Sequence, residues 1–180
     1  ALYVQKGIKL ISQISGGPQE NHKRASTENV PGIVGMGKAA ELTQNRMKKN
    51  NQKLQRLRDN LISGIEKNID NVFLNGPRKD NRVNNNVNFS FENISGESIL
   101  INLDMSGIAA ASGSACASGT LEPSHVLKAI GLSSNLTKGS LRLTLGENNS
   151  QEDVNYVNEL LPGVIQKLRN MTPKYNEELY

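Results

Sequence analysis

The sequence predicts an α+β fold in which helices cover one side of a short sheet. Helical and strand periodicities alternate along the 180 residues, and the expected strands are short. Those strands also carry polar residues on one face, so only their other face needs a layer of helices to bury it. At roughly 100–200 residues per domain, the length suits one domain, or one domain and part of another.

The first thirty residues are expected to be mostly irregular. The apolar residues 2–4 resemble the end of a strand. Residues 12–27 contain Gly16, Gly17 and Pro18 and have no apolar period, which predicts a loop. The chain begins at Ala1 rather than at Met, so we expect it to be a portion of a longer or processed polypeptide.

A long helix is expected to follow this loop. Asn29 is a suitable N-cap, and Pro31 falls in the first turn, where a helix makes no use of the backbone N–H. The helical period continues to about Asn68. The apolar residues of the second half recur on one face and predict a buried stripe, formed by Leu54, Leu57, Leu61, Ile62, Ile65 and Ile69.

The middle of the chain is expected to contain short elements. An Asn run at 84–86 interrupts it, and we interpret that run as compositional bias because apolar residues are interleaved with the Asn. The predicted elements are a turn at Gly76 and Pro77, a strand formed by Val83, Val87, Phe89 and Phe91, a short helix over 97–105, and a short strand over 108–111.

The last third is expected to contain helix, strand and helix. Thr120 or Leu121 precedes a helix over 122–130, which has Pro123 in its first turn and ends before Gly131. Residues 140–145 alternate, with three leucines on one face and Arg142 and Thr144 on the other. The final elements are a helix capped by Ser150 and Asp153, with an apolar stripe over 154–168 and a kink or break at Pro162 and Gly163, and a tail after Met171.

Composition and charge exclude several classes of protein. The net charge of +4 is small and dispersed, so we expect no nucleic-acid binding. No apolar run approaches the ~20 residues of a membrane span, and no signal peptide is visible. A single cysteine excludes an intramolecular disulfide and a zinc site of several thiolates.

That cysteine, Cys116, is the strongest candidate for chemistry. It lies within 112–120, a segment of small residues that predicts a loop. Most free cysteines are buried structural thiols. A thiol among Gly and Ser is instead suited to meet a substrate, and its reactive form would be the thiolate. Both interpretations of Cys116 remain open at this point.

Other candidates are weaker. Arg142 lies on the polar face of its strand, and its planar guanidinium could bind a carboxylate, although a solvated surface role is the more common one. The loop 16–27 precedes a helix N-terminus and could bind an anion there. His22 and His125 are far apart in sequence, and we expect surface or helix-capping roles for them and no metal site.

Four motifs in order give the chain a resemblance to a known family. Residues 112–116 (SGSAC), 121–127 (LEPSHVL) and 140–142 (SLR) resemble the C-terminal part of a cysteine desulfurase, a class V aminotransferase of fold type I. Residues 16–31, with Gly-Gly, Gln-Glu, Arg24 and Thr-Glu-Asn-Val-Pro, are similar to another stretch of the same family. The cysteine loop is similar to that of the group that serves iron–sulphur cluster or nitrogenase assembly.

The resemblance implies a pyridoxal 5'-phosphate enzyme that converts L-cysteine to L-alanine. Cys116 would take the sulphur as a persulfide, and Arg142 would bind the substrate carboxylate. Thr27 would reach the cofactor phosphate of the neighbouring subunit of a homodimer. The implied partners are iron–sulphur scaffold or sulphur-acceptor proteins, and the implied location is cytoplasmic.

The resemblance also implies a division of the chain and a missing residue. Residues 1–30 would be a remnant of the large cofactor-binding domain with the dimer-contact loop, 31–70 a long connecting helix, and 71–180 the small C-terminal domain with the cysteine loop. The Schiff-base lysine of the family would lie upstream of Ala1, so we expect the 180 residues alone to be inactive. Pro18 and Ser26 replace residues that are usually glycine in the family.

Two other functions remain open from the sequence. The chain could be a non-catalytic binding domain that presents Cys116 to scaffold or sulphur-acceptor proteins, because the lysine-bearing part is missing. It could also belong to a selenocysteine lyase or a related sulphur lyase, since that chemistry uses a similar frame.

Overall fold

The computed structural model describes residues 1–112 and 124–171. The chain divides into two compact units, Ala1–Met47 and Lys48–Tyr180. The first unit contains α1 (Gln19–His22) and the beginning of α2 (Val30–Asn68). The second contains the rest of α2, the sheet and the remaining helices. The domain boundaries expected from the sequence stay a prediction.

The first unit is irregular up to residue 18, so the strand expected at residues 2–4 was wrong. Leu2 and Tyr3 are exposed, and no strand pairs with them within the described residues. A strand needs a neighbour for its backbone N–H and C=O groups, and a short apolar run does not supply one. The predicted loop is confirmed except for α1, a single turn at Gln19–His22.

The long helix α2 confirms its predicted start and end. The side-chain Oδ1 of Asn29 accepts a hydrogen bond from Gly32 N at 3.1 Å, which satisfies one of the free N–H groups of the first turn. The helix ends at Asn68, and the predicted stripe is buried from Leu57 onward, with Leu54 half-buried and Ile69 buried just after the helix. Leu57, Leu61 and Ile65 are each 1 % exposed.

The described part of the second unit contains a three-stranded antiparallel sheet with the order β1-β2-β3. Its strands are β1 (Val72–Leu74), β2 (Asn86–Phe91) and β3 (Ser140–Thr144). Along β2, Val87 lies opposite Leu143 and Asn88 lies opposite Arg142. Side chains alternate between the faces of a strand, so this register collects apolar residues on one face and polar residues on the other.

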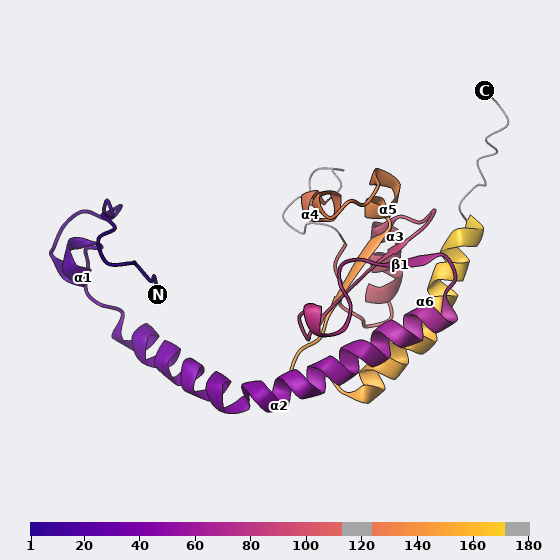
Figure 1. Ribbon diagram of the computed structural model, residues 1–180, viewed down its shortest axis with the longest axis horizontal. Helices are drawn as coiled ribbons and strands as arrows, with labels where there is room; N and C mark the ends of the chain where they lie inside the picture. Colours follow the sequence, from indigo (N-terminus) through magenta and orange to yellow (C-terminus); the bar gives the residue numbers. More distant parts are fainter. Residues whose placement is uncertain (113–123, 172–180) are drawn as a thin grey trace, which may run out of the picture. The chain divides into compact units, whose positions relative to one another are not determined.

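Helices α2, α3 (Gly96–Asp104) and α6 (Gln151–Met171) cover the apolar face of the sheet, which confirms the predicted α+β layer. Figure 1 shows α6 alongside the second half of α2. Hydrogen bonds join them, including one from Asn60 Nδ2 to Gln151 Oε1 at 2.8 Å. Fully buried aromatic and aliphatic residues of the strands and α3 complete the core: Val87, Phe89, Phe91, Ile99, Leu103 and Leu141.

Several short elements differ from their predictions. Val83 is exposed and lies outside β2, because the chain between β1 and β2 passes through a short 3-10 turn, Lys79–Asn81. The strand expected at 108–111 is reduced to one bridge, between Ala111 and Arg142. The sequence did not indicate β1 or α5 (Ser134–Lys138), which have three and five residues and too few positions for a periodicity.

The helix predicted over 122–130 is α4 (His125–Ala129). Its N-cap is Ser124, whose side chain accepts from Leu127 N at 3.4 Å, rather than Thr120 or Leu121. Thr120 and Leu121, together with 122–123, lie outside the described residues. The predicted stop is confirmed, because Gly131 has φ +94° and its N–H bonds to Lys128 O at 2.9 Å.

The last helix, α6, starts with the predicted cap and does not split. Ser150 N donates to Asp153 Oδ2 at 3.0 Å, and Asp153 N donates to Ser150 Oγ at 3.3 Å. The helix is continuous through Pro162, against the expected break. Buried residues on both sides of the proline, among them Val154 and Ile165, keep the helix on the core, which offsets a cost of about 3 kcal/mol.

The turn that leads into β3 depends on a glycine. A Cβ on Gly139 would overlap the backbone O of Phe91 and would lie 2.9 Å from Ile94 O. The backbone of Gly139 also bonds to the strand, since Phe91 N donates to Gly139 O at 3.0 Å. Neither obstacle is a flexible side chain, so a larger residue would force the backbone apart.

We therefore expect Gly139→Ala to destabilise the protein by about 1–3 kcal/mol, through overpacking against the backbone. Chemical denaturation measures this change. Gly163→Ala is the matched control, because nothing lies within 4 Å of the added Cβ in the middle of α6. The control should stabilise by about 0.5–1 kcal/mol, through helix propensity. Equal effects at the two positions would contradict the close approach at Gly139.

The capping pair makes stability depend on pH. The backbone N–H of Ser150 and then the side chain of Asn149 hold the pKa of Asp153 below its ordinary value. A carboxylate with a lowered folded-state pKa contributes stability above its unfolded pKa and loses it as the pH falls through the folded pKa. We expect Asp153→Asn to lower Tm at neutral pH, with a difference from the native chain that vanishes in strong acid. Circular dichroism melts over a pH series measure it, and a difference independent of pH would refute the role of the charge.

Candidate functional site

Arg142 lies on the polar face of the sheet, as its strand alternation predicts. Leu141 and Leu143, its neighbours on β3, are buried at 1 % and 5 % exposure, whereas Arg142 is exposed. Its backbone exchanges two hydrogen bonds with Ala111, at 2.6 and 3.0 Å. Its guanidinium makes no ion pair with any residue that the structure describes. The backbone is therefore fixed on this side, while no described acid neutralises the charge.

A network of amide side chains lies beside Arg142. Asn88 is the residue directly opposite it on β2. Asn75, buried at 6 % exposure, donates from Nδ2 to Asn88 Oδ1 at 2.6 Å and to Ser90 Oγ at 2.9 Å. Asn75 N also donates to Asn88 O at 2.9 Å. Both the backbone and the side chain of Asn75 therefore hold Asn88 in one orientation.

Asn75, Asn88 and Arg142 line a cavity of about 320 Å³ between the polar face of the sheet and α4. That size suits a small molecule. The described lining contains no carboxylate. Helix α4 and its flank contribute an apolar part, with Val126, Leu127 and Ile130, and the polar part consists of Asn75, Asn86, Asn88, Ser124, His125 and Arg142. An arginine among amides, with no counter-charge in the described lining, favours an anionic ligand.

Two buried arginines hold the loop that carries Asn75 and Asn86. Arg82 donates to Pro77 O at 2.6 Å, to Asn86 O at 3.3 Å and to the backbone O of Asn75. Arg58 on α2, fully buried, donates to Arg82 O at 2.9 Å. Burial and, next, the charge of Arg58 lower the pKa of Arg82 from its ordinary value. The carbonyl oxygens that accept from Arg82 compensate part of this cost of burial, and those bonds fix the rim of the cavity.

His125 was expected to be a surface or capping residue, and the structure places it in the lining of the cavity. It is the first residue of α4 and is exposed. The sequence indicated no link between His125 and Arg142, because residues 17 positions apart on separate elements share no periodicity. His22 lies in the first unit, at the end of α1 with φ +61°. Within 1–112 and 124–171, no three His, Cys, Asp or Glu residues are grouped to hold a metal ion.

Thr27 lies in the first unit, three residues before α2 begins at Val30. It is exposed, and its hydroxyl has no hydrogen bond to the described residues. Ser26 next to it has φ +84°, a conformation rare for a residue with a side chain. The nearby Gln19 has a buried Oε1 without a hydrogen-bond partner within the described part of the chain. Thr27 therefore presents an exposed hydroxyl just before the N-terminus of α2.

Of the three predicted site residues, the structure describes Arg142 and Thr27, and it places them in different units. Cys116 lies outside the described residues, so its proposed role stays a prediction. The cavity partners of Arg142, mainly Asn75 and Asn88, were not predicted. The sequence did contain a signal for Asn88, because the alternation of the predicted strand places Asn88 on the polar face of β2.

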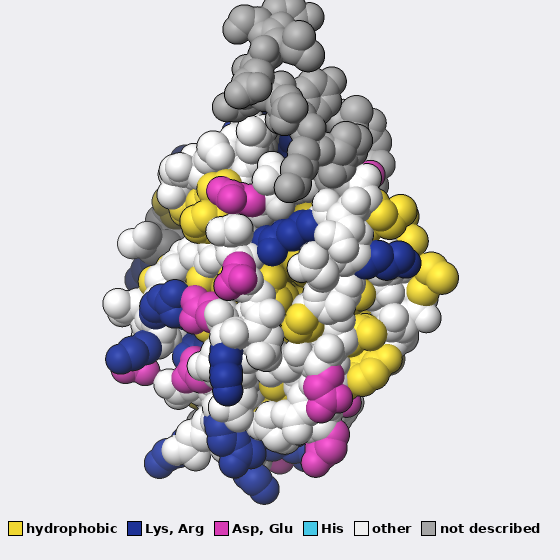
Figure 2. All heavy atoms as spheres, turned by 90° about the vertical axis from the view of Figure 1, so that its right-hand side faces the viewer, with side chains coloured by type: hydrophobic (Ala, Val, Ile, Leu, Met, Phe, Trp, Pro, Cys, Tyr) yellow, Lys and Arg dark blue, Asp and Glu magenta, His cyan; other side chains and the backbone are white. Residues whose placement is uncertain are grey.

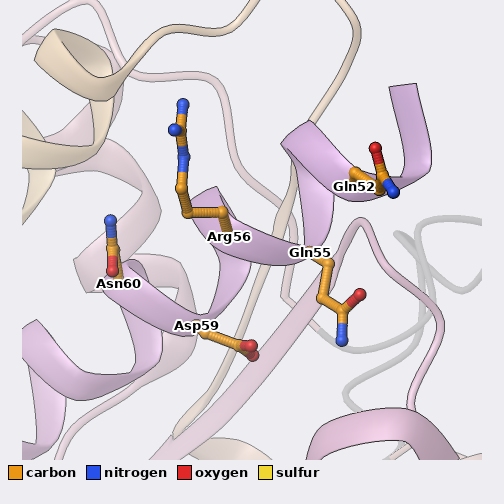
Figure 3. A pocket seen from close by; sticks show the side chains of 5 residues that line it. All are labelled: Gln52, Gln55, Arg56, Asp59 and Asn60. Atoms are coloured by element: carbon orange, nitrogen blue, oxygen red, sulfur yellow. The ribbon is translucent and has the colours of Figure 1, made fainter. Parts of the chain in front are cut away.

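A second hollow, of about 370 Å³, lies along α2 (Figure 3). Its lining comes from that helix alone, and Figure 3 shows Arg56 and Asn60 pointing away from Gln55 and Asp59. Gln55 donates to Asp80 Oδ1 at 3.1 Å, and Asp59 accepts from Arg58. Most of its polar groups are thus engaged in contacts that hold the fold, and the side chains do not converge on one point.

The surface shows no accumulation of one charge on the face drawn in Figure 2, where Lys and Arg lie among Asp and Glu. Two of the ion pairs are between exposed or half-exposed side chains, Lys38 with Glu41 and Arg78 with Glu66. None of the described helices is both long and apolar enough to cross a membrane.

Fold and cavity together define an α+β domain that presents an arginine from a sheet face, with no acidic partner among the residues that the structure describes. The sequence profile of the aminotransferase class-V family matches residues 8–157. The match covers most of the chain, and the chain belongs to this family.

Within the family, the chain is similar to cysteine desulfurases. It is 53% identical over 178 residues to cysteine desulfurase IscS of Clostridium botulinum, covering 98% of this chain and 45% of that protein. It is 52% identical over 173 residues to cysteine desulfurase IscS of Methanosarcina thermophila, covering 96% of this chain and 42% of that protein. The chain thus spans about half the length of the curated relatives that it matches.

Solved structures agree with this assignment. A NifS-like protein superimposes with a TM-score of 0.79 at 28% identity, over 92% of this chain and 42% of the other. A NifS-like protein from Rickettsia africae gives a TM-score of 0.74 at 28% identity, over 88% and 41%. The resemblance stated from the four motifs is confirmed at the level of the family and the fold.

Proposed function

We propose that the whole protein is a cysteine desulfurase that removes sulphur from L-cysteine and leaves it as a persulfide on Cys116. The observation that carries this proposal is the Arg142 guanidinium, which lines a small cavity without a carboxylate among its described residues. The similarity to cysteine desulfurases supports the choice of substrate. It gives no support to the alternatives of a non-catalytic binding domain or a selenocysteine lyase.

Arg142 would bind the carboxylate of the substrate. Its planar fork can make two parallel charge-assisted hydrogen bonds to a carboxylate. The bridge to Ala111 fixes the backbone of Arg142, so the guanidinium starts from a defined place. An amino acid held in this way would be oriented by one end, which lowers the entropic cost of the reaction at its other end.

Pyridoxal 5'-phosphate would supply an electron sink for bond cleavage on the amino acid. Of the described residues, Thr27 would hold the phosphate, in a neighbouring subunit of a homodimer. Its chemistry fits this group, because an exposed hydroxyl just before a helix N-terminus can donate to a phosphate oxygen. We propose that the Schiff-base lysine comes from the part of the protein that this chain does not span.

Cys116 would act as the nucleophile toward the substrate sulphur. Its thiolate would form a new S–S bond while the C–S bond of L-cysteine breaks, and the carbon would take up a proton to give L-alanine. The net change is L-cysteine plus a thiol giving L-alanine plus a persulfide, which balances without an external oxidant or reductant. Iron–sulphur scaffold or other acceptor proteins in the cytoplasm would then collect the sulphur.

The first test replaces Cys116 in the whole protein. Cys116→Ser should abolish sulphide release from L-cysteine in the presence of a reductant, because a hydroxyl cannot store the sulphur. The visible absorption of bound pyridoxal 5'-phosphate should be unchanged, which shows that the variant is folded and loaded. Full activity of Cys116→Ser would refute the proposed role.

The second test replaces Arg142. We expect Arg142→Ala to raise KM for L-cysteine by roughly 10–100-fold, through loss of charge-assisted hydrogen bonds to the carboxylate. Arg142→Lys should recover part of the affinity, because a lysine keeps the charge and loses the fork. Arg56→Ala is the control, since Arg56 is an exposed arginine of the hollow on α2. Steady-state kinetics decide, and an unchanged KM in Arg142→Ala would remove the basis of the proposal.

A further inference from the structure

We propose that Asn88 is a second residue for the substrate carboxylate, and that Asn75 acts as a positioning residue that turns the amide of Asn88 toward it. This inference rests on the proposed function of Arg142. The structure shows Asn88 and Arg142 as register partners on adjacent strands, and both line the same cavity. Directly opposed residues of an antiparallel pair have Cβ atoms about 4.5–5.5 Å apart, so one carboxylate can contact both side chains.

The orientation of the Asn88 amide follows from its neighbour. An Asn side chain has one acceptor and one donor group, and the hydrogen bonds around it determine which faces where. Asn75 Nδ2 donates to Asn88 Oδ1 at 2.6 Å, so the oxygen of Asn88 is directed toward Asn75. The Nδ2 group of Asn88 has no acceptor within the described residues and is left as a donor to the cavity.

Hydrogen bonds hold the side-chain amide of Asn75 itself in one orientation. Its Nδ2 group donates a second time, to Ser90 Oγ at 2.9 Å, at a buried position. Its backbone O accepts from Arg82, and its backbone N donates to Asn88 O. A reversal of the Asn75 amide would direct an oxygen at the oxygen of Asn88, which leaves buried polar groups unpaired.

The cavity would then offer an amide donor and a guanidinium to the same anion. A ligand without a carboxylate would leave both unpaired, and this penalty is the usual source of strong discrimination by hydrogen-bonding sites. The inferred function of the pair is therefore selectivity for an amino acid with a free carboxylate over its amide or ester.

The test is a double-mutant cycle in the whole protein, with steady-state kinetics on L-cysteine. Asn88→Ala should raise KM about tenfold, because a hydrogen bond to a charged group is lost, while kcat changes less. Asn75→Asp keeps the shape of residue 75 and turns its donor into an acceptor, so the amide of Asn88 should reverse and KM should rise by a similar factor. In the Asn88→Ala background, Asn75→Asp should add little, because the amide that it reorients is gone.

Two controls separate orientation from charge and folding. Asn84→Asp adds the same negative charge within the Asn run 84–86, outside the described cavity lining, and should leave KM unchanged. Thermal melts of each variant show whether it is folded. If Asn75→Asp raises KM equally with and without Asn88, residue 75 acts through its charge and the positioning role is overturned. If Asn88→Ala leaves KM unchanged while Arg142→Ala raises it, the second contact is overturned and the proposed function stands.

A binding measurement distinguishes a failure of the Asn88 contact from a failure of the proposed desulfurase function. Side-chain amide NMR signals are followed while L-alanine, and separately L-alanine amide, is added to the protein. The Asn88 NH₂ signal should shift with L-alanine and remain in place with the amide. That result supports the carboxylate contact whether or not L-cysteine is turned over. An absence of turnover would refute only the desulfurase activity. Equal shifts with both probes would overturn the contact.

Discussion

The rest of the structure depends on the opposed alternation of β2 and β3. The leucines of β3 and the aromatic residues of β2 bury one face against α2, α3 and α6, and this burial leaves no freedom in the pairing of the strands. A slip of one residue would turn Arg142 and Asn88 into the core and expose the apolar residues. The pairing that buries the hydrophobic face therefore also determines which residues lie on the opposite face. The cavity is formed by the residues of that opposite face.

The parts of this arrangement with a strong local signal could be predicted from the sequence. The stripe of α2, the Asn29 cap, the Ser150–Asp153 pair and the alternation around Arg142 each depend on neighbours within a few residues. Elements that depend on distant partners could not. β1 exists through its pairing with β2, and the Asn75–Asn88 contact joins residues across a loop, where an Asn-rich stretch looked like composition alone. Cys116 and the domain boundaries stay predictions.

The two buried arginines show how a loop without regular structure becomes a rigid rim. Carbonyl oxygens of residues 75, 77, 82, 83 and 86 accept from Arg58 or Arg82, and an ordinary loop would leave such groups to water. A planar group with five donors can serve several carbonyls at once. Burial of the guanidinium charge costs free energy, and these hydrogen bonds compensate part of it while they hold the loop in place. The amides of this loop line the cavity of Arg142.

The shortness of β1 has a consequence for the behaviour of the protein in concentrated solution. β1 forms an outer strand of the described sheet, and it has three residues before the chain leaves the sheet at Gly76 and Pro77. Asn-rich chains tend to stack into extended cross-strand assemblies, and an open sheet edge is the usual template. An edge of three residues followed by a proline offers few free backbone groups to a second chain. This edge of the sheet therefore resists self-assembly despite the bias of the sequence.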